Sequence, residues 1–168
     1  QEFLSGREVC RHTLLGNYYL FGAPTAVLYR SDLVRARPAF YNQNNIHGDM
    51  EVCYQLLQES DFGFVYQALT YSRQREDSQS AASSGMDTYI VGDLECLLKY
   101  GPVFLEPAEQ QLRLSEMLDD YQRTLARSVL RCREMKYWHY HQEACARLGL
   151  NIDRGRIAWL ALRDAAGF

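Results

Sequence analysis

Hydrophobic residues recur every three or four positions through most of the chain beyond residue 87, and this spacing predicts amphipathic helices. One helix is predicted over residues 89–100, where Gly101 and Pro102 would end it. Pro107 suits the first turn of the next and longest helix, because an N–H at that position would have no partner within the helix. The second half of the chain is therefore predicted to be a set of packed helices.

Two shorter helices follow, and each has a recognisable boundary. The first holds residues 137–148 and stops at Gly149, since glycine tolerates the left-handed conformation that commonly follows a helix. The second begins after Asp153, whose carboxylate can accept hydrogen bonds from first-turn amides.

The first half of the chain mixes helical and strand-like patterns. A helix is predicted over residues 5–15. Residues 25–29 are apolar and partly β-branched, and residues 64–66 are Phe, Val and Tyr, so both segments favour strands. Residues 69–72 read as another short extended piece, and residues 75–86 as a polar loop.

Between these strands, Asp49 stands where a helix N-cap is expected. Val52, Cys53 and Leu56 follow it at helical spacing and form an inward-facing stripe. The whole pattern predicts an α+β fold that is mostly helical. A small partial sheet with flanking helices occupies residues 1–85, and a bundle of helices occupies residues 86–168.

Composition excludes several classes of protein. The formal net charge of −3 argues against a nucleic-acid-binding surface. No apolar run is long enough for a transmembrane helix, and the chain opens without a basic-then-apolar leader. We expect a cytoplasmic protein, with a membrane-peripheral location left open. The opening QEFLSGREVC lacks a Met and is helix-like by Arg7, as expected of a segment from within a longer protein.

The 5 cysteines are widely spaced, and no CxxC pair occurs among them. A zinc ribbon and a dithiol redox motif are therefore not supported. We expect free, mostly buried thiols. Neither GxGxxG nor GxxxxGK is present, so no glycine-rich phosphate loop is predicted either.

A few polar residues in the first half are candidates for chemistry. Asp49 could serve only as an N-cap, or it could be a general base presented to a cleft from the start of a helix. Arg73 and Arg75 alternate on an extended segment, so both would face one way, as suits a diphosphate or a carboxylate. Pairing with nearby acidic residues is the alternative for both arginines. His47 could join a site, although a loop histidine is more often simply solvated.

The order of these pieces resembles the second half of family-two glycosyltransferases of the GT-A type. The resemblance covers roughly residues 16–80, in the segments GAPTAVLYRSDLV, GDMEVCYQLL and DFGFVYQALTYSRQREDSQS. Members show a Gly/Pro turn and a strand ending in an aromatic residue and Arg. An acidic helix start, a Gly-aromatic strand and a Tyr-x-Arg segment follow. The matching positions here are Gly22, Pro24, Tyr29, Arg30, Asp49, Glu51, Leu56, Gly63, Phe64, Val65, Tyr71, Arg73 and Ser78.

The resemblance implies a function. Asp49 would be the catalytic base of an inverting transfer of a sugar from a nucleotide-sugar donor to an acceptor hydroxyl. Other residues would bind substrate, namely Tyr29, Arg30, His47 and Glu51 around the acceptor, and Arg73 with Arg75 near the diphosphate. The intact enzyme could use a divalent cation, Mg²⁺ or Mn²⁺, whereas no cofactor and no metal ligand are expected within this piece.

This sequence departs from the family pattern in three places. Gln55 stands where the helix often carries Arg, and Arg75 stands where His is common. The nucleotide-binding half, with its Asp-x-Asp metal motif, does not occur in residues 1–48. The piece alone is therefore expected to be inactive and to self-associate through uncovered strand edges. The competing interpretation is a non-catalytic helical module that docks a protein partner.

Overall fold

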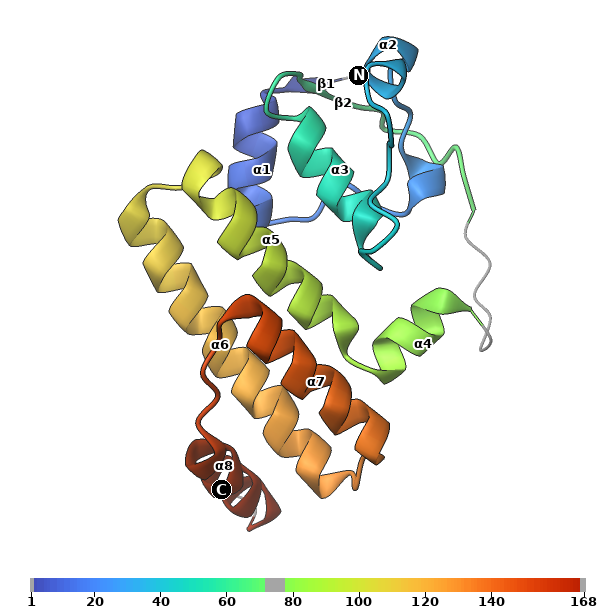
Figure 1. Cartoon of the computed structure of the whole chain (residues 1–168). Coiled ribbons are helices and arrows are strands. Elements are labelled where there is room, and N and C mark those ends of the chain that lie inside the picture. The colour runs from blue at the N-terminus through green and yellow to red at the C-terminus, as the bar shows by residue number, and fades with distance from the viewer. Residues whose placement is uncertain (1, 72–77, 167–168) are drawn as a thin grey trace.

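A computed structural model describes residues 2–71 and 78–166 (Figure 1). In this part of the chain the fold is α+β and mostly helical, as the sequence predicted. The elements follow in the order β1 (Glu2–Leu4), α1 (Gly6–Leu14), a 3-10 turn η1 (Pro24–Ala26), α2 (Ser31–Arg35), α3 (Gly48–Leu56), β2 (Phe62–Phe64), α4 (Gln79–Gly85), α5 (Thr88–Phe104), α6 (Pro107–Leu130), α7 (Met135–Leu148) and α8 (Arg154–Ala165).

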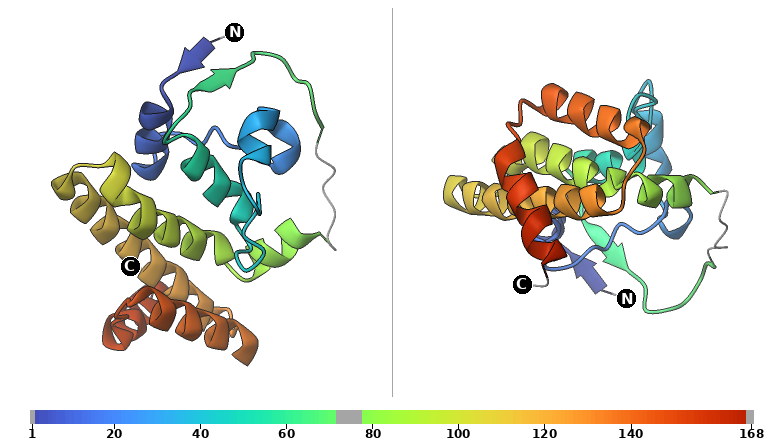
Figure 2. Two further views of the ribbon diagram at one scale, coloured as in Figure 1. Left: turned by 45° about the horizontal axis from the view of Figure 1, so that its top comes forward. Right: turned by 90° about the horizontal axis from the view of Figure 1, so that it is seen from below.

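The sheet consists of β1 and β2, which pair antiparallel with Phe3 opposite Gly63 (Figure 2). The strand predicted over residues 64–66 is thus found two residues earlier. The strand predicted over residues 25–29 is wrong, because the segment begins as η1 and continues without a partner strand among the described residues. An extended backbone counts as a strand only where a neighbour accepts its hydrogen bonds.

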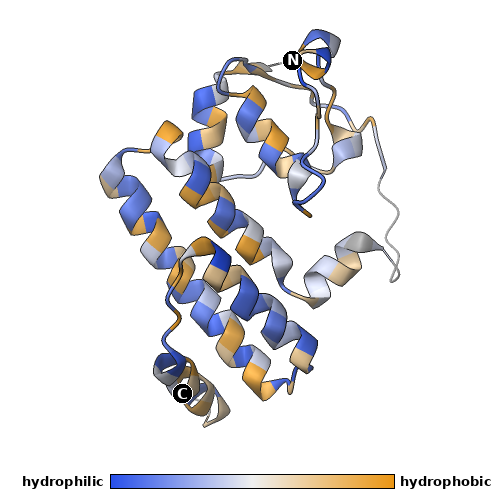
Figure 3. Cartoon of the chain, in the orientation of Figure 1, coloured by the Kyte–Doolittle hydropathy of each residue, from blue (hydrophilic) through white to orange (hydrophobic). Residues whose placement is uncertain are grey.

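Helix α5 lies at the centre, with α1 packed on one side and α6 on the other (Figure 1). Leu94 and Leu97 of α5 are almost fully buried, and one cluster of buried hydrophobic residues extends from α1 to α8. Hydrophobic and hydrophilic residues alternate along the long helices in the way that amphipathic packing requires (Figure 3). Residues of both sequence-predicted regions therefore contribute to one continuous core.

The predicted end of α5 at residues 101–102 is wrong, since the helix continues to Phe104. A proline inside a helix removes one hydrogen bond. The ring of Phe104 is buried and packs 6.3 Å from the ring of Tyr54, and this tertiary contact favours the extra turn. Gly101 allows α6 to come close, because a Cβ there would lie 2.9 Å from atoms of the Gln110 side chain.

Other helix boundaries agree with the sequence. Gly149 adopts a φ of 65° after α7, and the Asp153 carboxylate accepts a hydrogen bond of 3.0 Å from the Arg156 amide. Part of the loop predicted over residues 75–86 is instead α4. The Ser78 side chain caps this helix by accepting from the Ala81 amide at 3.1 Å.

A buried polar network joins the start of α5 to α6 and α7. His141 Nδ1 lies 2.7 Å from the Tyr121 hydroxyl, and Nε2 lies 3.1 Å from the Met86 carbonyl oxygen, which fixes Nε2 as the donor. The Tyr137 hydroxyl donates to Asp87 at 2.9 Å, where the backbone takes the uncommon φ of 50°. These bonds hold the turn before α5 and so position the first residues of that helix.

The thiols agree with the expectation from the sequence. Cys10, Cys53, Cys96 and Cys145 are free and buried, whereas Cys132 is free and exposed. Burial raises the pKa of Cys10 to about 12, so this thiol is protonated at neutral pH and is not poised for nucleophilic chemistry.

Candidate functional site

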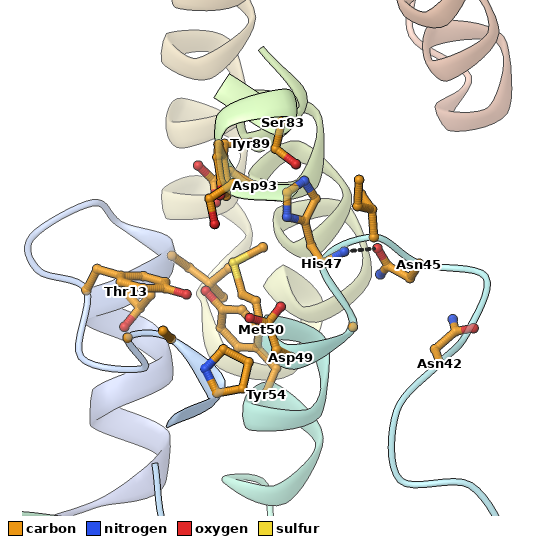
Figure 4. Close-up of a pocket in the computed structure, with 18 of the residues that line it drawn as sticks. Thr13, Asn42, Asn45, His47, Asp49, Met50, Tyr54, Ser83, Tyr89 and Asp93 are labelled. Carbon is orange, nitrogen blue, oxygen red and sulfur yellow. Dashed lines mark hydrogen bonds between the residues drawn. The ribbon is translucent and has the colours of Figure 1, made fainter. Parts of the chain in front are cut away.

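A cavity of about 970 Å³ opens between the two halves of the chain. Its walls come from the end of α1 with the segment up to Pro24, from residues 41–50 at the start of α3, and from α4, α5 and α6. Figure 4 shows Ser83, Tyr89 and Asp93 on one side, facing Asp49 and Met50 of α3. Its volume falls within the range of about 300–1,000 Å³ that small-molecule sites occupy.

Asp49 lies in the first turn of α3 and lines this cavity. Its prediction as an N-cap is wrong, because the helix begins one residue earlier and His47 occupies the cap position. The cause is the tight turn before the helix, in which the Gly48 amide donates to the Asn45 carbonyl at 3.0 Å. The Asp49 side chain is half-buried, and none of the described residues hydrogen-bonds its carboxylate. Both oxygens are therefore able to accept a hydrogen bond from a ligand.

His47 also lines the cavity, where it is part of the wall and is not a solvated loop residue. Its Nε2 donates to the Thr88 carbonyl oxygen at 3.1 Å, and its ring lies 4.9 Å from the ring of Tyr89. Gly92 of α5 makes room for this ring, because a Cβ there would lie 2.5 Å from His47 Cδ2. His47 thus fixes the start of α3 against α5.

Glu51 does not line the cavity but lies buried beneath residues 42–47. It accepts hydrogen bonds from the side-chain amides of Asn42 at 3.2 Å and Asn45 at 3.0 Å, and it pairs with the Lys99 ammonium. Burial opposes ionisation of Glu51, but Lys99 and the two amides outweigh it and hold the pKa of this carboxyl below its usual range. Glu51 therefore supports the loop that carries the site.

The remaining predicted residues are not brought to this cavity in the described part of the chain. Tyr29 lies against Cys53, with its hydroxyl 3.4 Å from the sulfur, and packs on the Phe40 ring at 4.9 Å. Arg30 is exposed and pairs with Asp32. Arg73 and Arg75 lie outside the described residues.

Asp93 was not among the residues predicted from the sequence, yet it faces the cavity from α5 (Figure 4). None of the described residues hydrogen-bonds its carboxylate. Although more than a third of Asp93 is exposed, the surrounding walls remove water from it and raise its pKa, against the opposing effects of His47 and Arg113. Asp93 is a charged residue in the apolar stretch VGDLECLL, four positions after Tyr89. This spacing places Tyr89 and Asp93 on one helix face, and it is the feature of the sequence from which their shared position could have been predicted.

Asp49 and Asp93 act together on Tyr19, another cavity residue. Burial, and after it the negative charges of Asp49 and Asp93, raise the pKa of the Tyr19 hydroxyl. Within residues 2–71 and 78–166, no group of three histidine, cysteine or acidic side chains could hold a metal ion. The cavity is thus an aromatic-lined site with two carboxylates that have no hydrogen-bond partner among residues 2–71 and 78–166, and it is suited to accepting hydrogen bonds from a ligand.

Comparisons with known protein families, with curated proteins and with solved structures find no match for this chain. Among the described helices, none has the length and apolar character needed to cross a membrane.

Proposed function

We propose that this chain is the acceptor-side part of an inverting glycosyltransferase and that Asp49 is its general base. The observation that carries the proposal is the Asp49 carboxylate, which faces a ligand-sized cavity with no hydrogen-bond partner among the described residues. A half-buried carboxylate with no partner among the described residues has oxygens that can accept a hydrogen bond from a hydroxyl entering the cavity. The ordered resemblance over residues 16–80 supports the same function.

In the proposed reaction, Asp49 accepts the proton of an acceptor hydroxyl as that oxygen attacks the anomeric carbon of the donor sugar. The new C–O bond forms on the face opposite the bond that breaks, and the nucleoside diphosphate departs with the electron pair. His47 and Glu51 would position the base, since both hold the turn that begins α3. The donor-binding part would come from chain outside this sequence.

The test replaces Asp49 by Asn in the protein that contains this chain and measures sugar transfer. Loss of a general base costs about a hundredfold or more in kcat, and the KM for the nucleotide sugar should change little. Asp120→Asn is the matched control, because Asp120 is exposed on α6 and does not line the cavity. An Asp49→Asn enzyme within a few-fold of the control would exclude Asp49 as the base.

A further inference from the structure

The charge of the cavity restricts what can enter it. Asp49 and Asp93 face the same space from α3 and α5 (Figure 4). Arg113 is the one cationic side chain among the described lining residues apart from His47. Its Nε donates to the Leu14 carbonyl at 3.1 Å, and its Nη1 lies 3.2 Å from a Glu116 oxygen. Two of the guanidinium nitrogens are therefore held by the chain itself, although the charge still acts on Asp93. Among the described lining residues, two carboxylates thus stand against one engaged guanidinium.

The cavity also presents aromatic surface to an entering ligand. Tyr18, Tyr19, Tyr41 and Tyr89 line it with exposed fractions of 37%, 52%, 39% and 45%. A tyrosine offers an apolar ring face and a hydroxyl on one rigid side chain, which makes it effective at binding surfaces. Apolar ring faces and hydroxyl-binding groups together match a sugar ring, whose C–H faces and hydroxyl edges alternate in the same way.

We propose that the acceptor is a saccharide without negative charge and that Asp93 anchors it by accepting hydrogen bonds from its hydroxyl groups. This inference rests on the proposed function, since it gives Asp49 the reacting hydroxyl and Asp93 a non-reacting one. An acceptor bearing a carboxylate or phosphate would place a third negative charge near two carboxylates that have no hydrogen-bond partner among the described residues. A sugar hydroxyl donates to Asp93 without that repulsion.

Binding of small saccharides to the 168-residue chain tests the inference. The probes are methyl glycosides of glucose, galactose and mannose and the three matching uronides, which replace only the C6 alcohol by a carboxylate. Saturation-transfer NMR titrations at millimolar probe should show at least one neutral glycoside binding and its uronide binding about tenfold more weakly or not at all. Equal binding of both members of every pair, or no binding by any neutral glycoside, would overturn the proposal.

Variants connect the binding to Asp93. Asp93→Asn should weaken the neutral glycoside about tenfold and narrow its advantage over the uronide, whereas Asp120→Asn should change neither. Thermal melting checks that each variant is folded. Unchanged glycoside binding in folded Asp93→Asn would refute the anchoring role.

The two proposals fail differently. Asp49→Asn should leave glycoside binding within a few-fold but lower transfer by about a hundredfold or more. Normal transfer by this variant would therefore exclude Asp49 as the base without excluding the acceptor site. Uronide binding as tight as glycoside binding would refute the proposal of an uncharged acceptor, whereas the proposed role of Asp49 as the base would still stand.

Discussion

Replacing Gly92 by Ala tests how the cavity wall is assembled. The added Cβ would lie 2.5 Å from Cδ2, 2.9 Å from Cγ and 3.1 Å from Nε2 of the buried His47 ring. The ring would have to move, which strains or breaks its hydrogen bond to the Thr88 carbonyl. Overpacking costs about 1–3 kcal/mol, and Ala regains about 0.5–1 kcal/mol over Gly in a helix. We therefore expect a net loss of about 0–2.5 kcal/mol in the free energy of unfolding, with a central value of about 1 kcal/mol.

The same substitution should change sign when His47 is first replaced by Ala. With the ring removed, only the helix propensity remains, so Gly92→Ala should stabilise the His47→Ala protein by about 0.5–1 kcal/mol. Equilibrium urea unfolding of the wild type, Gly92→Ala, His47→Ala and the double variant gives the coupling free energy between positions 47 and 92. Equal effects of Gly92→Ala in both backgrounds, within about 0.5 kcal/mol, would show that the ring and α5 are not in contact.

Three further predictions concern stability and assembly. Glu51→Ala leaves two asparagine amides and the Lys99 ammonium without their acceptor. The free energy of unfolding measured in urea should therefore fall by about 2 kcal/mol. A loss below about 0.5 kcal/mol would count against a stabilising role for this network. Burial holds the pKa of His141 below its unfolded value, although the Met86 carbonyl opposes this shift. The unfolded chain therefore binds more protons below pH about 6.5, and stability should fall as pH drops through that value. His141→Gln should remove that part of the slope, and an unchanged slope would contradict the assignment. The hydrophobic side chains of Phe3 in strand β1 and of Leu28 are 73% and 97% exposed. Because exposed apolar side chains and strand edges favour association, sedimentation velocity should show concentration-dependent self-association. The Phe3→Ser variant should associate more weakly. A constant monomer at high concentration would contradict it.

The helices of the second half could be predicted from the sequence because their signals are local. The Asp153 cap, the proline that opens α6 and Gly149 act within one turn of the chain. The errors arose where distant contacts decide. The extra turn of α5 depends on Phe104 packing near Tyr54, and β2 depends on pairing with β1, which is far away in sequence.

In the candidate site too, residues with a local sequence signal could be predicted, whereas those placed by distant contacts could not. Asp49 could be found because it follows a polar loop and opens an apolar-periodic helix. Glu51 looked equivalent, but its burial against Lys99 depends on a residue 48 positions away. Asp93 was missed because one acidic residue in a helix is usually solvated, and only the packing of α5 beside α3 turns it into the cavity.

The proposed role of Asp49 as the base is tested most sharply by the single-turnover rate constant for sugar transfer in the Asp49→Asn enzyme at saturating donor. Single turnover isolates bond formation from product release, so it reports the step in which the base acts. If Asp49 takes the acceptor proton, the constant should fall by about a hundredfold or more relative to the Asp120→Asn control. A constant within about threefold of that control would show that Asp49 is not the base.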